Sequence, residues 1–237
     1  MSSNKKKEAE LRGEKEWESI DNAVIKSQSF LEKYSNYIFG AIGVFVIIAC
    51  GYLAYQHFYV GPKTKDAQNA IAQGQIYYES GLDSLALFGD ANGYIGFEKV
   101  AKEYSSTSTG NLANAYAGIC YARMGNYAKA LDFLKSYSSS GDEVISYMVQ
   151  GTIGDCLRAD GKAGEAISYY EKAAKSLDNF IHSPLFYQKA ANIYREQGKY
   201  DKVIEIYTLI KDQYMNSPVA MEADKYIEEA NLLKAGK

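Results

Sequence analysis

Residues that commonly carry out catalysis are scarce in this chain of 237 residues. The two histidines, His57 and His182, have no Cys, Asp or Glu around them in the arrangement of a metal-binding motif. The sequence also has no Gly-x-Ser-x-Gly nucleophile motif, no phosphate-binding Gly-x-x-x-x-Gly-Lys-Ser/Thr loop and no Cys-x-x-Cys pair. We therefore expect a protein that is not an enzyme and that uses no metal and no cofactor.

The three cysteines offer another chemistry, the formation of a disulfide. Cys50 lies in a long apolar run, whereas Cys120 and Cys156 occupy the same place in two similar stretches of sequence. On stacked helices, equivalent atoms of neighbouring repeats would be about 8–10 Å apart, beyond the roughly 7 Å between Cα atoms that a disulfide can span. We expect Cys120 and Cys156 to be small buried packing residues, and a disulfide in an exported domain is the alternative.

The apolar run from Tyr37 to Val60 contains no Asp, Glu, Lys or Arg. As a helix rising ~1.5 Å per residue it would reach roughly 36 Å, enough to cross a hydrocarbon core of about 30 Å. It starts late for a signal peptide, is too long, and ends on bulky residues where a cleavage site would need small ones. We expect one uncleaved transmembrane helix rather than a buried helix of a soluble core.

The distribution of positive charge around this run predicts its orientation. Seven Lys and Arg residues precede it, whereas only Lys63 and Lys65 follow it before Lys99. The positive-inside rule then places the N-terminus in the cytoplasm and the rest of the chain outside. Within about 20 residues of the membrane the two sides are equal in positive charge, so the reversed topology stays open. The net charge of −3 gives no reason to expect binding to nucleic acid.

Three stretches in the second half of the chain are similar to one another. Their glycines Gly125, Gly161 and Gly198 are 36 and 37 residues apart, and each suits a turn with positive φ. A small residue precedes each glycine by seven positions and a small or β-branched residue follows it by five. This pattern resembles the tetratricopeptide repeat, a helix–turn–helix unit of about 34 residues whose stacking buries a continuous core. The flanking residues are Gly118, Gly154 and Ala191, then Ala130, Ala166 and Val203.

The predicted fold is all-α, with a single transmembrane helix followed by a solenoid of tetratricopeptide-like repeats and a C-terminal capping helix. Gly61-Pro62 is expected to end the membrane helix, and Ser217-Pro218 to open the capping helix. The apolar stripe of the capping helix consists of Val219, Ala223, Tyr226, Ile227, Ala230 and Leu233. The expected segments are a charged cytoplasmic tail with a juxtamembrane helix at 1–36, the transmembrane helix at 37–60, a degenerate first helix pair at 61–110, and three repeats with the capping helix at 111–237.

The first helices of such repeats line a concave groove, which is the candidate binding site. Arg and Tyr side chains suit recognition, because they offer bidentate hydrogen bonds and rigid apolar area. An ordinary solvated surface is the alternative for these positions. Most tyrosines of the repeats fall at core or turn positions, so we expect them to pack rather than to stack on bases. Repeat position places these side chains in the groove: Tyr116, Ile119, Arg123, Asp155, Arg158, Lys189, Asn192 and Arg195.

The layout of the whole chain is similar to that of the YfgM-type ancillary subunits of the bacterial Sec translocon. The segments that carry the likeness are residues 30–34 (FLEKY), 96–104 (GFEKVAKEY), 110–113 (GNLA) and 183–184 (SP). The resemblance implies a bacterial inner-membrane protein with a cytoplasmic N-terminus and a periplasmic repeat domain. It also implies partners among translocon subunits, a membrane-tethered periplasmic chaperone and exported chains, with no nucleic acid and no small-molecule substrate.

Two other interpretations remain open at the level of sequence. One is an adaptor of a different cell-envelope assembly, such as cell division, outer-membrane assembly or cytochrome maturation. The other is a solenoid that faces the cytosol in the reversed topology. Co-purified partners would distinguish the first from a translocon subunit, and cysteine labelling from the periplasmic side would identify the second.

Overall fold

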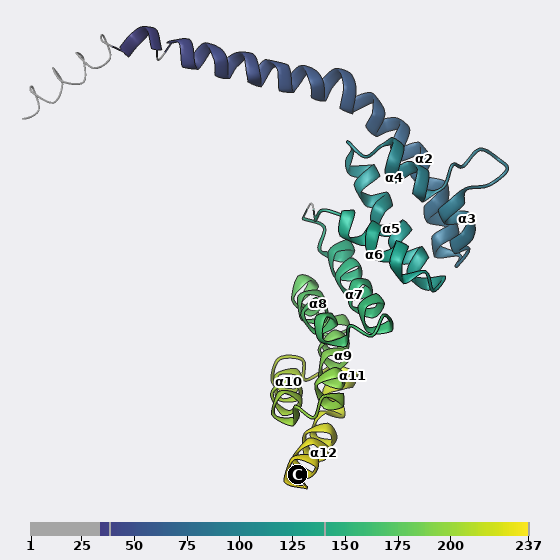
Figure 1. The fold of residues 1–237 in the computed structure, drawn as a ribbon, viewed down its shortest axis with the longest axis vertical. Coiled ribbons are helices and arrows are strands. Elements are labelled where there is room, and N and C mark those ends of the chain that lie inside the picture. Colours follow the sequence, from purple (N-terminus) through teal and green to yellow (C-terminus); the bar gives the residue numbers. More distant parts are fainter. Residues whose placement is uncertain (1–33, 38, 140, 237) are drawn as a thin grey trace, which may run out of the picture. The chain divides into compact units, whose positions relative to one another are not determined.

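The computed structural model describes residues 34–37, 39–139 and 141–236, and these contain helices and no strand (Figure 1). They fall into two units that divide between Tyr59 and Val60. The predicted all-α fold is therefore confirmed. Most of the predicted cytoplasmic tail and juxtamembrane helix, residues 1–33, lies outside the described residues.

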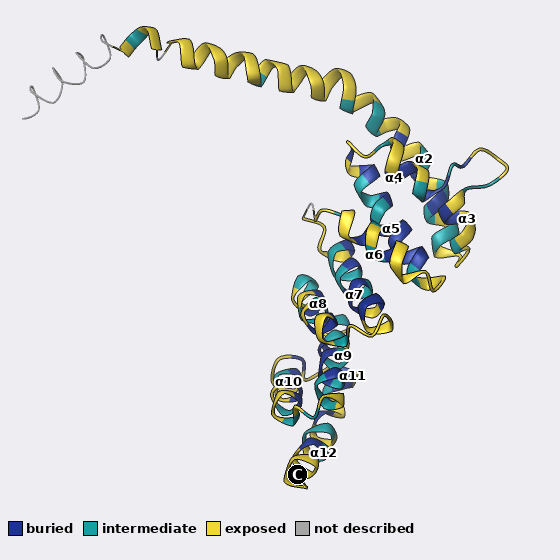
Figure 2. Cartoon of the chain, viewed as in Figure 1, coloured by how far each residue is buried: buried dark blue, intermediate teal, exposed yellow. Residues whose placement is uncertain are grey.

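The first unit consists of the apolar segment. Residues 34–37 and 39–55 are helical, and a π-helical turn η1 (Gln56–Val60) follows them. The side chains along this helix are exposed almost throughout, with Phe39 and Phe45 each 72% exposed (Figure 2). Among the described residues, the helix that contains this segment is the one long and apolar enough to cross a membrane.

The prediction that Gly61-Pro62 ends this helix is wrong, because helical backbone continues through it as α2 (Gly61–Glu79). Pro62 has no backbone N–H to donate to the preceding turn, so one hydrogen bond of the continuous helix is missing here. The wider turn of η1 comes directly before it, and the Thr64 hydroxyl donates to the Val60 carbonyl at 2.8 Å. A local π-helical turn and a side-chain hydrogen bond therefore accommodate the proline without a break.

The second unit begins with a helix pair in the region where the sequence predicts a degenerate first pair. α2 provides the first helix, with Ala67, Ile71 and Gly74 buried, and α4 (Phe97–Glu103) provides the second. A further short helix, α3 (Asp83–Phe88), was not predicted from the sequence. It packs on α2 and α5 and buries Ala86 and Leu87.

Three clear helix pairs follow, and each helix packs against the next one along the chain (Figure 1). The predicted turn glycines Gly125, Gly161 and Gly198 join the helices of each pair, and all three have positive φ, between 68° and 78°. A residue with a side chain would be strained there. The pairs are α5 (Ser108–Arg123) with α6 (Tyr127–Ser136), α7 (Glu143–Ala159) with α8 (Ala163–Leu177), and α9 (His182–Glu196) with α10 (Tyr200–Gln213).

Side-chain caps define several of the helix starts. The backbone N–H of Gly110 donates to the Thr107 hydroxyl at 3.0 Å at the start of α5, and that of Ile145 donates to the Asp142 carboxylate at 3.1 Å at the start of α7. Each cap satisfies an N–H that has no partner within its helix. This cap fixes the position of the Asp142 side chain, where the connection from α6 meets α7.

Small residues let the two helices of a pair approach closely. A Cβ atom added to Gly118 on α5 would lie 2.5 Å from Cγ of Leu134 on α6, which is too short for any real contact. Cys120 and Cys156 are fully buried free thiols in the same core, so the prediction that they pack rather than form a disulfide is confirmed. Buried residues concentrate where neighbouring helices of the second unit meet (Figure 2).

The predicted capping helix is present, in two pieces. α11 (Pro218–Met221) begins with the Ala220 N–H donating to the Ser217 hydroxyl at 3.0 Å, and α12 (Ala223–Ala235) follows after Glu222. Val219, Ala223 and Ala230 are buried against the last pair, as the apolar stripe predicts. Leu233, from the same stripe, is instead 41% exposed, because the last turns of α12 have no further helix to pack against in the described chain.

Candidate functional site

Two clefts lie along the face that the first helices α2, α5, α7 and α9 form. We call them the amide cleft, of about 440 Å³, and the aromatic cleft, of about 470 Å³. The amide cleft is lined by Gln68, Ile71, Gln75, Ser108, Thr109, Asn111, Leu112, Tyr137 and Asp142. The aromatic cleft is lined by Tyr78, Ile119, Ala122, Arg123, Tyr127, Tyr147, Met148, Gly151, Thr152, Asp155, Cys156, Phe186 and Lys189.

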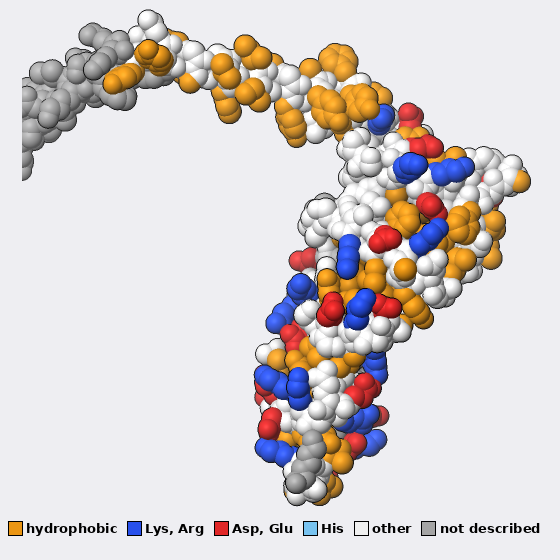
Figure 3. Space-filling view, in the orientation of Figure 1, with side chains coloured by type: hydrophobic (Ala, Val, Ile, Leu, Met, Phe, Trp, Pro, Cys, Tyr) orange, Lys and Arg blue, Asp and Glu red, His pale blue; other side chains and the backbone are white. Residues whose placement is uncertain are grey.

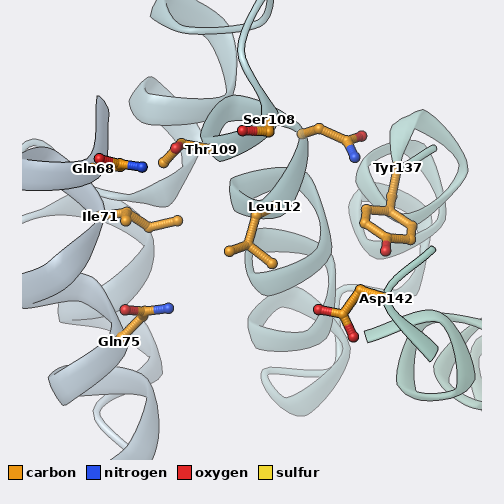
Figure 4. Close-up of a pocket in the computed structure, with 9 residues that line it drawn as sticks. Gln68, Ile71, Gln75, Ser108, Thr109, Leu112, Tyr137 and Asp142 are labelled. Carbon is orange, nitrogen blue, oxygen red and sulfur yellow. The ribbon is translucent and has the colours of Figure 1, made fainter. Parts of the chain in front are cut away.

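In the amide cleft, polar side chains from α2 face α5 and the connection between α6 and α7. Figure 4 shows Gln68, Ile71 and Gln75 on one side and Leu112 with Tyr137 on the other. The opposite wall is held by Asn111. Its side-chain amide donates to the Ser138 carbonyl at 2.7 Å, and its side-chain oxygen accepts the Ser138 N–H at 2.8 Å. The cleft therefore combines primary amides with apolar surface from Ile71 and Leu112.

The aromatic cleft depends on the absence of a side chain at Gly151. A Cβ atom there would overlap the ring of Phe186, which packs from α9 across α7. The ring of Tyr147 contacts Phe186 edge to face at 6.0 Å between centroids. Ile119 is buried and Met148 half-buried on the same surface. Together these residues form an apolar wall with aromatic rings arranged in favourable edge-to-face geometry.

Two ion pairs border the aromatic cleft. Nζ of Lys189 donates to both carboxylate oxygens of Asp155, at 2.6 and 2.8 Å, and the hydroxyl of Tyr170 donates to the same carboxylate at 2.8 Å. At the other end, the guanidinium of Arg123 lies 4.3 Å from the ring centroid of Tyr78 and 3.3 Å from the Asp83 carboxylate. Each cation therefore has an anionic partner within the solenoid, and the cleft has no large net charge.

The eight predicted groove residues divide into three groups. Ile119, Arg123, Asp155 and Lys189 line the aromatic cleft. Tyr116 lies between the two clefts, because Gln75 of the amide cleft donates to its hydroxyl at 3.3 Å and Tyr78 of the aromatic cleft contacts its ring at 4.9 Å.

The other three predicted residues line neither cleft. Arg158 pairs with Glu196 at 2.6 Å and Arg195 pairs with Glu229 at 3.2 Å, so both cations join neighbouring first helices to the next element. Asn192 is half-buried on α9. Arg158 and Arg195 therefore connect repeats along the solenoid, and each such exposed pair is worth at most about 1 kcal/mol.

Several residues of the clefts were not predicted from the sequence. Tyr147, Met148 and Phe186 precede the repeat positions that the alignment of the three stretches covers, and Gln75 and Tyr78 belong to the degenerate first pair. The spacing of residues along α7 and α9 could have identified some of them. Gly151 and Asp155 are one turn apart on α7, and Phe186 and Lys189 are one turn apart on α9, so each pair shares one helix face.

The cleft side chains suit binding rather than covalent chemistry. Burial raises the pKa of the Cys156 thiol to about 11, so this thiol is protonated at neutral pH and is a poor nucleophile. Burial also raises the pKa of Tyr78. Within the described part of the chain, no three His, Cys, Asp or Glu residues are grouped as a metal site would need. Charges of both signs are interspersed over the solenoid surface (Figure 3).

The comparison with known families agrees with this geometry. Residues 187–213 match the family profile of the tetratricopeptide repeat. The match covers most of α9 and all of α10, the helix pair that Gly198 joins. No curated protein and no solved structure is significantly similar to the chain. The described chain is thus an all-α protein with tetratricopeptide-like helix pairs, a class of repeat that typically binds proteins and is not catalytic.

Proposed function

We propose that this protein is a non-catalytic, membrane-anchored scaffold whose solenoid binds other proteins. The observation that carries this proposal is the pair of clefts along the first helices, which together present apolar, aromatic and amide groups on one face. Extended concave surfaces of this kind are how helical-repeat proteins hold their partners. The apolar helix before the solenoid supplies the anchor, because it is long enough to cross a bilayer.

In this proposal residues 37–60 cross the bacterial inner membrane. Residues 1–36 lie in the cytoplasm, and residues 61–237, with the degenerate pair, the three repeats and the capping helix, lie in the periplasm. The support is the excess of Lys and Arg before the apolar run. The alternative is the reversed topology, with the solenoid in the cytosol, and cysteine labelling distinguishes the two.

The partners we propose are subunits of the Sec translocon, a membrane-tethered periplasmic chaperone, and exported chains. The role would be that of an ancillary subunit that assists protein export or recruits the chaperone. The support is the resemblance of the layout and of residues 30–34, 96–104, 110–113 and 183–184 to the YfgM-type subunits. Neither nucleic acid nor a small-molecule substrate forms part of this proposal.

A pull-down of the tagged full-length protein from native membranes in mild detergent, read by mass spectrometry, tests the proposal. We expect translocon subunits together with a membrane-tethered chaperone. Recovery of a different envelope complex would retain the scaffold and replace the translocon by that assembly, for example one of cell division, outer-membrane assembly or cytochrome maturation. Recovery of no protein above the level of an untagged strain would contradict the scaffold function itself.

A further inference from the structure

We infer that the amide cleft and the aromatic cleft together hold one extended, uncharged polypeptide segment. The amide cleft would bind its backbone, and the aromatic cleft would take one bulky apolar side chain. This inference rests on the proposed scaffold function and names the class of segment that the groove accepts. It distinguishes an unfolded, uncharged stretch from a charged terminal tail.

The two clefts follow one another along α2 and α5. On α2, Ile71 and Gln75 line the amide cleft and Tyr78 lines the aromatic cleft, in steps of four and three residues. On α5, Leu112 and Ile119 do the same, with Tyr116 between them. Residues three and four apart lie on one face of a helix. The residues that line the two clefts therefore share one face of α2 and one face of α5, an arrangement that suits an extended chain.

The aromatic cleft offers space for an apolar side chain of the bound segment. On α5 its wall includes the small residue Ala122, and on α7 Met148 offers a flexible side chain that adapts to shape. The rings of Tyr147 and Phe186 stand beside this space. Burying a large apolar or aromatic side chain from water is the main source of affinity at such a site.

The charges at the clefts argue against a charged occupant. Arg123 pairs with Asp83 and Lys189 pairs with Asp155, so a charged side chain entering the aromatic cleft would have to break an existing pair. In the amide cleft, the Asp142 carboxylate accepts the N–H of Ile145 as a helix cap. The charges at the aromatic cleft thus compensate one another within the solenoid, and an uncharged side chain is the electrostatic complement there. The amide cleft is lined by one carboxylate, Asp142, and by no Lys or Arg.

The amide cleft supplies what a peptide backbone needs. Every peptide group brings one donor and one acceptor, and each must be paired when it leaves water. The side chain of a glutamine offers both kinds of group. Gln68 is exposed on α2, and Gln75 uses one N–H on Tyr116, which leaves its carbonyl oxygen and a second N–H for a ligand.

Binding of defined peptides to the full-length protein in lipid nanodiscs tests this inference. The probes are fluorescein-labelled peptides of about 12 residues, roughly 40 Å when extended. They consist of Gly, Ser and Asn with one central guest residue: Phe, Leu, Asp or Lys. Fluorescence anisotropy should show that the Phe and Leu peptides bind at least about tenfold more tightly than the Asp and Lys peptides. Equal or tighter binding of a charged guest would overturn the inference.

Two variants with matched controls locate the binding. Tyr147→Ala should weaken the Phe peptide by about fivefold, whereas Tyr147→Phe, which keeps the ring, should bind it as the wild type does. Gln68→Ala should weaken the Phe and Leu peptides equally, by about threefold. The controls are Tyr169→Ala on α8 and Gln213→Ala on α10, which line neither cleft and should change nothing. Unchanged affinity in both Tyr147→Ala and Gln68→Ala would contradict the assignment.

The failure of this inference can be told apart from failure of the scaffold function. If the pull-down recovers the same partners from Tyr147→Ala as from the wild type, and the peptides do not discriminate, the scaffold stands and the inference is wrong. If no protein is recovered with either form, the scaffold function is wrong whatever the peptides do.

Discussion

The ring of Tyr170 occupies the space that a side chain at Gly154 would need. A Cβ atom at position 154 would lie 2.6 Å from Cε1 of Tyr170, and the hydroxyl of the same tyrosine donates to the Asp155 carboxylate at 2.8 Å. Asp155 in turn accepts two hydrogen bonds from Lys189 in the aromatic cleft. One fully buried side chain of α8 therefore fixes both the close packing of α7 on α8 and the polar edge of the groove.

Tyr170→Phe separates these two roles, because it keeps the ring and removes the hydroxyl. We expect a loss of about 1 kcal/mol in the free energy of unfolding, the usual worth of one such hydrogen bond at a partly exposed carboxylate. Urea unfolding followed by circular dichroism measures it. A loss of more than about 3 kcal/mol would mean that the hydroxyl, rather than the ring, dominates the packing.

Gly154→Ala should be more damaging, because the new methyl group overlaps the ring of Tyr170. Overpacking of this kind costs about 1–3 kcal/mol. Gly164→Ala is the matched control, since a Cβ there has no atom within 4 Å and the position is helical with negative φ. Its stability should stay the same or rise by up to about 1 kcal/mol. Equal effects of the two changes on urea unfolding would contradict the packing described for Gly154.

These packing relationships show which features of the fold can be predicted from the sequence alone. The spacing of Gly125, Gly161 and Gly198 predicted the helix pairs, because a turn with positive φ has a strong residue preference. The buried free thiols Cys120 and Cys156 followed from their equivalent repeat positions. Local signals of this kind depend on residue type and spacing alone, so they can be recognised without a structure.

Other features depend on contacts between distant residues and could not be predicted in this way. α3 is six residues long, too short for a clear helical period, and it is stabilised by packing on α2 and α5. The helix continued through Gly61-Pro62 because η1 widens just before it, a change that residue preferences do not predict. The ring of Phe186 lies in the groove because Gly151, 35 residues earlier in the chain, leaves space for it.

The ion pairs near the candidate site likewise could not be predicted from the sequence. Repeat position predicts that Arg158 and Arg195 face the groove, but it does not predict that Glu196 and Glu229 pair with them. Helical position predicts which way a residue projects on its own helix. It does not predict which partner the neighbouring helix will place within 4 Å.

The two buried thiols offer a probe of the native solenoid. In a Cys50→Ser variant of the full-length protein, both Cys120 and Cys156 should react with maleimide at pH 8 only as fast as the solenoid opens. Burial raises the pKa of Cys156 to about 11, so that roughly one thiol in a thousand is ionised at that pH. Mass spectrometry should find both thiols modified after unfolding in urea. Rapid modification of the native protein would contradict the buried placement.

The proposed topology can be tested with an introduced cysteine. Ala91 is exposed at the tip of the loop between α3 and α4, so Ala91→Cys should react with a membrane-impermeant maleimide in cells whose outer membrane has been permeabilised. Ser3→Cys, before the apolar run, should react only after the inner membrane is broken. The opposite pattern would establish the reversed topology, with the solenoid in the cytosol.

The central claim is that the groove face of the solenoid binds proteins, and photo-crosslinking in living cells tests it most directly. A photoreactive amino acid would replace Thr152, which lines the aromatic cleft, or Tyr169, which lies on α8 outside both clefts. We predict crosslinks to other proteins from position 152 and few or none from position 169, with translocon subunits or a membrane-tethered chaperone among the products. Equal crosslinking from both positions, or none from position 152, would contradict the claim.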